Sequence, residues 1–388
     1  MPPKRVKRKD KMAHDAIPIA EPPAQIPALA KLPAELFDEI ISYLRVLPLS
    51  FYYDTYYDKA RGNLPHPQFR ERTDALRALS ATCRALRDIS YHRLWSRLDI
   101  CWVPSEEAGT WYKYVMQSLQ TKSKGVVSSS DYLKESIRTI TLMLSKSDVA
   151  PTMTALRDLL EALPNLSTIQ VITCRIPGDF GRATQGLSCP NVRTVVIPTD
   201  CHAVLKACPN TMHVRCAGGS GVTLIGSLKF SKCETLDGMI NWVKDMKTVD
   251  RKLSIPFAGP LLSGITPSSG LIKNAPNLRK IEIRRPVCFG LGIMSQNKAP
   301  EQWSLVISKL SGLPKLRVIV LSFPGLEELP SDLVSIQKAR EVLRKSKLQE
   351  ERKLIVRRVI AQHYASPSDN KDHQVGDIVH RYEEEIFS

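Results

Sequence analysis

Cysteine and histidine gather in the middle of the chain, where they could bind zinc or act as a nucleophile and its base. The set comprises Cys174, Cys189, Cys201, His202, Cys208, His213 and Cys216. Structural zinc sites pair their ligands about two to four residues apart, and no two of these cysteines are that close. Adjacent residues on an extended chain point to opposite sides, which disfavours a catalytic pair at Cys201 and His202. The sequence therefore predicts no metal site here.

A glycine-rich segment and the carboxylates also fail to predict an active site. The segment AGGSGVTLIG begins at Ala217, but it has neither the lysine of a phosphate loop nor the three glycines of a dinucleotide fingerprint. No paired carboxylates stand out. We expect a noncatalytic protein that needs no cofactor and works by binding.

Most of these cysteines belong to a phrase that recurs along the chain: the end of a helix, a proline and a short strand. It reads EALPNLSTIQV from 161, LSCPNVRTVVI from 187, KACPNTMHVRC from 206, KNAPNLRKIEI from 273 and SGLPKLRVIVL from 311. Cys189 and Cys208 take the place before proline that leucine or alanine fills in the other copies. Free cysteine behaves as a small buried apolar residue, so these thiols are predicted to lie in the core.

Recurring helix, turn and strand units predict an α/β solenoid, in which each unit is buried against its neighbours. Apolar residues alternate after each proline, as in Leu166, Ile169 and Val171, so one strand face should point inward. These strands resemble degenerate leucine-rich repeats. Further strands are predicted at Val222–Phe230 and Leu253–Phe257, between the third and fourth phrases.

The positions between the inward residues should line a concave sheet that is mixed in polarity and mildly basic. Such a face offers recognition of another protein. The predicted target-binding residues are Gln170, Arg193, Arg279 and Glu282. Ordinary solvated strand residues are the alternative interpretation for each of them.

Residues 31–100 predict a separate helical module. Leu36, Ile40 and Leu44 recur every fourth residue after Pro33, a good helix-starting residue. A second helix is predicted from Asp74 through Leu86, and a third around Leu94, Trp95 and Leu98. Three short helices cannot bury this much apolar surface, so either a partner protein or the downstream domain covers it.

At these residues the chain resembles the F-box family. The matching elements are Leu32-Pro33 with Glu35, the Ile40 and Leu44 spacing, the run from Leu79 to Arg87, and Leu94-Trp95. The resemblance implies docking on a Skp-type adaptor and, through it, on a cullin. The positions that it implies as adaptor contacts are Leu32, Pro33, Ile40, Leu44, Leu79, Cys83, Leu86 and Trp95, with Trp95 as the expected hot spot.

The module departs from the family in a long inserted loop at about residues 46–73. It is rich in tyrosine and could touch target or adaptor, although a lid without a special role is the simpler interpretation. Residues 1–30 are predicted to be a disordered basic tail and a proline-rich linker. The tail contributes to the net charge of +16 and resembles a nuclear import signal; it could also contact nucleic acid through counterion release.

The C-terminal part, residues 331–388, is predicted to be one long basic helix running from Ser331 or Asp332 to about Tyr364, followed by a polar tail. Mixed charge along a helix usually marks a solvated face, and binding of nucleic acid is the alternative. The 101–330 segment between module and helix is assigned to the repeats. No apolar run approaches the roughly 18 residues that cross a bilayer, and the nine cysteines include no C-x-x-C pair. We expect a protein of the nucleus, the cytoplasm or both, with reduced thiols.

The leading hypothesis is a substrate receptor of a cullin-type ubiquitin ligase, with a target protein that the sequence does not identify. One alternative is a nuclear nucleic-acid or chromatin binder that uses the basic tail and the C-terminal helix. Another is an F-box scaffold that does not support ubiquitin transfer. These hypotheses differ in their partners: an adaptor with a cullin, DNA or RNA, or an adaptor alone.

Overall fold

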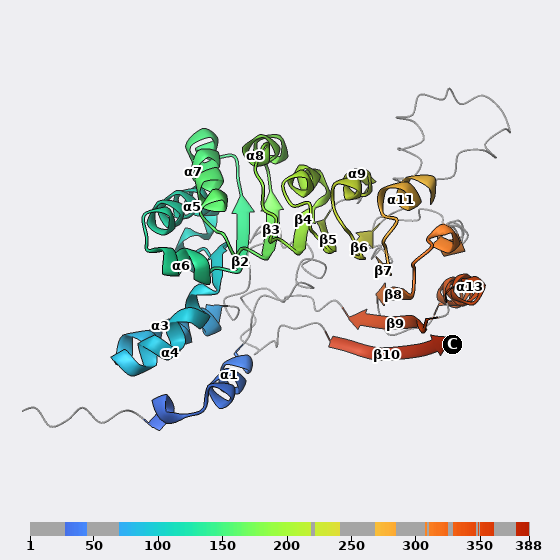
Figure 1. Ribbon diagram of the computed structural model, residues 1–388, viewed down its shortest axis with the longest axis horizontal. Coiled ribbons are helices and arrows are strands. Elements are labelled where there is room, and N and C mark those ends of the chain that lie inside the picture. The colour runs from blue at the N-terminus through green and yellow to red at the C-terminus, as the bar shows by residue number, and fades with distance from the viewer. Residues whose placement is uncertain are drawn as a thin grey trace, which may run out of the picture.

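A computed structural model describes residues 28–44, 70–218, 222–240, 268–284, 307–308, 310–324, 329–346, 348, 350–360 and 378–387. Its centre is a mixed α/β unit around one ten-stranded sheet (Figure 1). Each strand pairs with the next one in the chain; β1 to β9 are parallel, and β10 is antiparallel to β9. The strands are β1 (Arg97–Ile100), β2 (Thr139–Leu144), β3 (Thr168–Cys174), β4 (Thr194–Pro198), β5 (His213–Gly218), β6 (Thr235–Ile240), β7 (Lys280–Arg284), β8 (Val318–Pro324), β9 (Arg352–Ile360) and β10 (Ile378–Phe387).

Helices connect the parallel strands and lie along the outer, convex side of the curved sheet (Figure 1). They are α5 (Trp111–Val127), α6 (Asp131–Ser136), α7 (Val149–Glu161), α8 (Pro177–Thr184), α9 (Val222–Ser227), α11 (Ser268–Asn274) and α13 (Pro330–Lys345), with 3₁₀ turns η3 (Ser105–Thr110), η4 (Thr199–Lys206), η5 (Leu228–Phe230) and η6 (Leu310–Gly312). One strand face is buried beneath these helices. In β2 to β7 it carries a row of paired residues that are almost inaccessible to solvent: Ile140, Ile169, Val195, Val214, Leu236 and Ile281.

All five proline phrases enter the sheet through the same local turn. In each copy the residue after Pro-Asn or Pro-Lys donates its backbone N–H to the carbonyl of the residue before proline, over 3.1 to 3.4 Å. Proline favours the second position of such a turn because its φ is already fixed near the required value. The phrases of 161, 187, 206, 273 and 311 continue into β3, β4, β5, β7 and β8, so the predicted strands are confirmed at these five places.

Asparagine joins neighbouring turns to one another. Asn191 Nδ2 donates to the Pro164 carbonyl at 2.7 Å, and Asn210 Nδ2 donates to the Pro190 carbonyl at 3.0 Å. Asn165 does the same to the Glu135 carbonyl at 3.1 Å. Each amide therefore satisfies a backbone acceptor of the preceding unit, and the turns stack in the same order as the strands.

Several predicted elements are wrong. The polar segment TKSKG from Thr121 to Gly125 continues α5, which reaches Val127, since Leu119, Ser123 and Val126 form its buried face. Residues 222–230 form α9 and η5 rather than a strand. The strand of that region is β6, and no proline turn precedes it. The strand predicted at Leu253–Phe257 lies outside the described residues.

The long C-terminal helix is also wrong. Helix α13 ends at Lys345, and the basic residues that follow belong to strand β9. Buried Arg352 donates from Nη1 to the carbonyls of Leu343 and Ser346, at 2.8 and 3.0 Å, which caps the end of the helix. Asp332 accepts the Leu329 N–H at the start of α13. β10, at the end of the chain, pairs with β9 along its full length.

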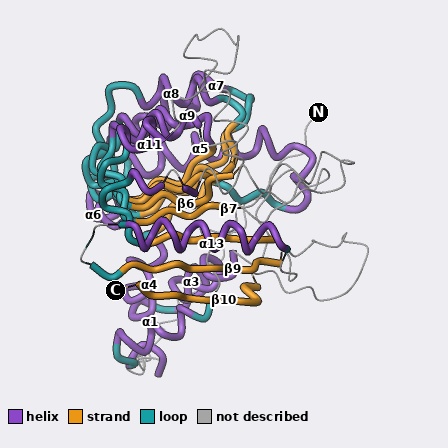
Figure 2. Tube along the Cα trace, turned by 90° about the vertical axis from the view of Figure 1, so that its right-hand side faces the viewer, coloured by secondary structure: helices purple, strands orange, loops and turns teal. Residues whose placement is uncertain are grey.

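The N-terminal helices pack at the β1 end of the sheet, below the row of outer helices (Figure 2). They are η1 (Ala28–Lys31), α1 (Ala34–Ser42), α3 (Glu71–Thr82) and α4 (Arg84–Trp95). The predicted second helix is interrupted at Cys83, whose extended backbone separates α3 from α4. Leu98 belongs to β1, not to the third helix. In the part of the chain that the structure describes, no helix has the length and apolar character needed to span a bilayer.

Candidate functional site

Helix α1 begins after Pro33, whose extended backbone precedes the first turn. Phe37 and Ile41, one turn apart, are buried against Leu76 of α3 and Leu86 of α4. This small core is separate from the large core under the sheet. It fixes which side of α1 faces the protein and therefore which side faces outward.

An ion pair holds α1 to α4 beside the small core. The Arg93 guanidinium contacts the Asp38 carboxylate, lies 5.1 Å from the centre of the Phe37 ring, and donates to the Ile89 carbonyl at 2.7 Å. Hydrogen bonding to Arg93 lowers the pKa of Asp38, and the same bond raises the pKa of Arg93. Both groups are charged at neutral pH, so the pair fixes the orientation of α1.

One exposed stripe along α1 and its C-cap is apolar, beside exposed Glu35, Glu39 and Ser42. Leu36 is 46% exposed, Ile40 45% and Tyr43 78%, and their spacing of four and three residues places them on one side of the helix. We call these three residues the α1 face. Sequence reasoning included Leu36 and Ile40 in a stripe but missed Tyr43, which its spacing from Ile40 could have indicated.

The residues predicted as adaptor contacts fall into three groups. Pro33 and Ile40 are exposed and Leu32 is half-buried at the start of the module. Leu44, Leu79 and Cys83 are half-buried against the small core, and Leu86 is fully inside it. Trp95 lies apart from them, half-buried against the large core, with its ring centre 6.1 Å from that of Tyr91.

A second surface is the sheet face opposite the helices. Its predicted target-binding residues do not lie together: Gln170 is on β3, Glu282 is on β7, and Arg193 and Arg279 precede β4 and β7. Gln170 and Glu282 are buried, whereas the two arginines are exposed. Gln170 accepts a hydrogen bond from Thr141 Oγ1 at 3.2 Å, so it stabilises the sheet in this structure.

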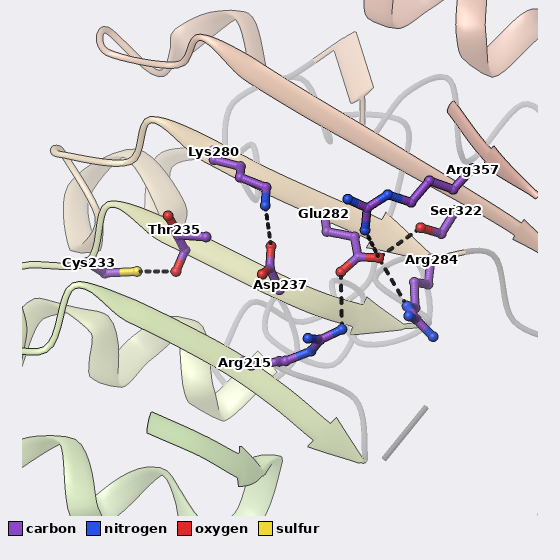
Figure 3. Close-up of polar contacts among 9 residues, drawn as sticks. All are labelled: Arg215, Cys233, Thr235, Asp237, Lys280, Glu282, Arg284, Ser322 and Arg357. Carbon is purple, nitrogen blue, oxygen red and sulfur yellow. Dashed lines mark hydrogen bonds and ion pairs between the residues drawn. The ribbon is translucent and has the colours of Figure 1, made fainter. Parts of the chain in front are cut away.

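Glu282 is the centre of a charged cluster built by four strands (Figure 3). Its carboxylate lies 3.2 Å from Arg284 Nε, 3.8 Å from Arg215 Nη2 and 4.0 Å from Arg357 Nη1. The Ser322 hydroxyl donates to it at 2.8 Å. We call these three arginines with Glu282 the arginine cluster. Sequence reasoning named Glu282 alone, because the cluster depends on the pairing of β5 to β9.

The cluster controls the charge of Glu282, which is only 2% exposed. Burial by itself would raise the pKa of this carboxyl, but Arg284, Arg215, the Ser322 hydroxyl and Arg357 together hold it below its ordinary value. Next to it, burial and the charge of Glu282 raise the pKa of Asp237, whose carboxylate lies 3.9 Å from Lys280 Nζ. Glu282 is therefore the carboxylate that holds the arginines in place at neutral pH.

Cys189 and Cys208 lie in the core, as their place before proline predicted, and Cys201 and Cys216 are buried as well. Hydrogen bonding to Cys174 and burial raise the pKa of the Cys201 thiol, and burial lowers the pKa of His202. Among the described residues, no three His, Cys, Asp or Glu side chains are arranged to hold a metal ion.

A scan against protein-family models finds no match to this chain, and a search of curated proteins finds no significant relative. The α1 face and the sheet face opposite the helices are the two candidate binding surfaces.

Proposed function

We propose that the chain is a substrate-receptor subunit of a cullin-type ubiquitin ligase. In this proposal α1, α3 and α4 form an F-box-like module that binds a Skp-type adaptor, and the sheet with its outer helices is a degenerate leucine-rich-repeat solenoid that holds a target protein. The chain itself performs no chemistry. It raises the effective concentration of target lysines near the ubiquitin-conjugating enzyme by tethering them.

The α1 face carries the proposal. Three large apolar side chains form one exposed stripe along α1 and its C-cap, while Phe37 and Ile41 are already used in the small core. Full burial of a large apolar side chain is worth about 1.5 to 3 kcal/mol. Leu36 and Ile40 are already about half buried, so a partner that covers this face gains the remaining part. The resemblance of the same residues to the F-box family supports a Skp-type adaptor as that partner.

The sheet supports the receptor half of the proposal. Its strands follow one another in sequence order, and the same turn precedes five of them. Stacked units of this kind present a long surface to a partner. Because the expected long basic helix is replaced by α13 and β9, the nucleic-acid alternative loses one of its two supports; the basic tail lies outside the described residues.

A pull-down of the full-length chain with a Skp-type adaptor tests the proposal. Ile40→Asp is expected to weaken binding at least tenfold, because it places a charge in the centre of the interface. Val127→Asp is the matched control, since Val127 is exposed at the end of α5, outside the module. Equal binding by the wild-type chain and Ile40→Asp, or no adaptor binding at all, would reject the assignment.

Cullin co-purification separates a receptor from a scaffold. A receptor brings both adaptor and cullin with it, and Ile40→Asp removes both. A chain that retains the adaptor but never recruits cullin is an F-box scaffold without ubiquitin transfer.

A further inference from the structure

Cys189 and Cys208 are free thiols in the turns that precede β4 and β5. Each lies directly before a proline, and each accepts the hydrogen bond of its own turn. Val192 N–H donates to the Cys189 carbonyl at 3.2 Å, and in the next unit Thr211 N–H donates to the Cys208 carbonyl at 3.1 Å. Since β4 and β5 are neighbours in the sheet and adjacent strands lie about 4.8 Å apart, the two cysteines are stacked at equivalent places of adjacent units.

The backbone and the sulfur atoms both bring this pair together. The Cys189 N–H donates to the Ala207 carbonyl at 2.7 Å, and Cys208 follows that carbonyl directly in the chain. Standard bond lengths then hold the two Cα atoms within about 7 Å of each other, close to the range of about 4.4 to 6.8 Å that a disulfide spans. The two thiols are already hydrogen-bonded to each other. A disulfide between them therefore needs rotation of two side chains rather than movement of the turns.

The two thiols differ in reactivity and in access. The hydrogen bond from Cys208 lowers the pKa of the Cys189 thiol, and the same bond together with burial raises the pKa of the Cys208 thiol. Cys189 is thus the more easily ionised of the two, and the thiolate is the nucleophile in cysteine chemistry. Cys189 is also closer to solvent, at 9% exposed against 0% for Cys208, and its neighbours Ser188 and Pro190 are exposed. A small oxidant therefore meets Cys189 first, with Cys208 behind it.

We propose that Cys189 and Cys208 form a reversible thiol–disulfide site that a peroxide oxidises. The Cys189 thiolate attacks one oxygen of hydrogen peroxide, the O–O bond breaks, and hydroxide leaves, which gives a sulfenic acid on Cys189. The Cys208 thiol then displaces the sulfenic hydroxyl as water, and the S–S bond forms. In total the two thiols lose two protons and two electrons, and one peroxide is reduced to two waters.

The site goes beyond the proposed receptor function and does not depend on it. Packing alone does not require sulfur at either place, since buried Leu163, Ala275 and Leu313 fill the same position in the other phrases. The new bond would join adjacent units across a loop of about 20 residues, which stabilises a fold mainly by constraining the unfolded chain. In a reducing compartment such a bond is transient, so it would form only under oxidation.

Mass spectrometry of the full-length chain tests the site, because trypsin places the two cysteines on separate peptides, residues 183–193 and 207–215. The reduced chain is treated with hydrogen peroxide, alkylated and digested without reductant. We expect these two peptides to be linked, with at least tenfold more of this link than of any link to Cys101 or Cys233, which are buried on other peptides. Dithiothreitol should remove the link.

Cys208→Ala is the test variant, since alanine fills the same place in the phrase from 273. It should abolish the link and leave Cys189 as a sulfenic acid, which dimedone labels at least tenfold more than in the wild-type chain. Cys233→Ala is the matched control: Cys233 is buried in the next unit, but its thiol donates to the Thr235 carbonyl at 3.3 Å. Oxidation should raise the melting temperature of the wild-type chain and of Cys233→Ala by about 4 °C or more, but not that of Cys208→Ala.

Three outcomes would overturn the site: no link between the two peptides in the oxidised wild-type chain, a link only between the peptides of Cys174 and Cys201, or a link found only in chains that run as dimers on a gel without reductant. Cys174 and Cys201 are the second hydrogen-bonded pair of thiols, and they lie on two further tryptic peptides. Thermal melting of the reduced variants checks that they are folded. The link in the wild-type chain is measured without any variant, so an unfolded Cys208→Ala would still leave the site open to rejection.

Discussion

Glu282 is a buried carboxylate held by three arginines, and its protonation state sets how much it stabilises the sheet. Its pKa in the folded chain lies below the ordinary value, which is about 4.3 in an unfolded chain. Its contribution to the free energy of unfolding is therefore fully present above that value and is lost as pH falls through the folded pKa. This sign is opposite to that of Asp237, whose raised pKa favours the protonated form.

We predict that Glu282→Gln lowers the free energy of unfolding by about 3 kcal/mol at pH 7, because it removes the buried carboxylate charge that attracts Arg284, Arg215 and Arg357. Denaturant melts at several pH values measure this difference, which should shrink steadily as the solution becomes more acidic than about pH 4. Glu161→Gln on α7 is the control; its exposed pair with Arg157 should contribute less than about 1 kcal/mol. A difference that is constant with pH would contradict the assigned charge of Glu282.

Trp95 and Tyr43 separate folding from binding within the N-terminal module. Trp95 packs against the large core and Tyr91, so Trp95→Ala is expected to lower the free energy of unfolding by about 2 kcal/mol. Tyr43 is largely exposed, so Tyr43→Ala should leave the free energy of unfolding unchanged and should instead weaken binding of the adaptor. Melting curves and adaptor pull-downs of both variants measure this. If Trp95→Ala removes adaptor binding without changing stability, Trp95 is the adaptor anchor that the resemblance implies.

At the scale of elements, hydrogen bonds from asparagine side chains join each turn between helix and strand to the turn of a neighbouring unit. Asn191 donates across to the carbonyl of Pro164 in the preceding unit. We predict that Asn191→Ala lowers the free energy of unfolding by about 1 kcal/mol, the usual cost of one such hydrogen bond. Gln117→Ala, on the exposed side of α5, should have almost no effect. Equal melting temperatures for the two variants would show that the stacked amides contribute nothing.

Helix α13 is held against β9 by a buried ion pair. Arg358 Nη1 lies 3.0 Å from Asp332 Oδ2, and both side chains are almost inaccessible. We predict that Arg358→Ala costs about 3 to 5 kcal/mol, because the Asp332 carboxylate stays buried without its cation. Arg344→Ala, exposed in the last turn of α13, is the control. A double variant, Asp332→Ala with Arg358→Ala, should recover part of the loss; no recovery would contradict the pairing.

The strands that sequence predicted correctly are those with a local signal. Proline sets the turn before β3, β4, β5, β7 and β8, and no such residue precedes β6 or β9. In β9 (RKLIVRRVI), the arginines and the lysine favour a helix by intrinsic propensity, whereas the valines and isoleucines favour a strand. Pairing with β8 and the capping role of Arg352 decide for the strand. The charged cluster could not be predicted either, because Arg215, Glu282 and Arg357 are far apart in sequence and are brought together only by the order of the strands.

Across the whole molecule, two cores of unequal size predict unequal local stability. Among the described residues, the small core under α1 has four buried apolar side chains, Phe37, Ile41, Leu76 and Leu86, whereas the large core extends beneath the sheet from β1 to β9. Segments with few buried contacts open more often than the rest of a protein. Amides of α1 should therefore exchange with solvent much faster than those of β3 and β4.

Hydrogen exchange with and without the Skp-type adaptor tests this prediction together with the proposed function. Binding on the α1 face stabilises the bound form, so exchange of α1 amides should slow at least tenfold while that of β3 and β4 stays the same. Ile40→Asp should abolish the slowing, and Val127→Asp should keep it. Equal exchange of α1 and β3 in the free chain would contradict the difference between the two cores. Slowing confined to the sheet would instead place the adaptor on the sheet and leave the α1 face for another partner.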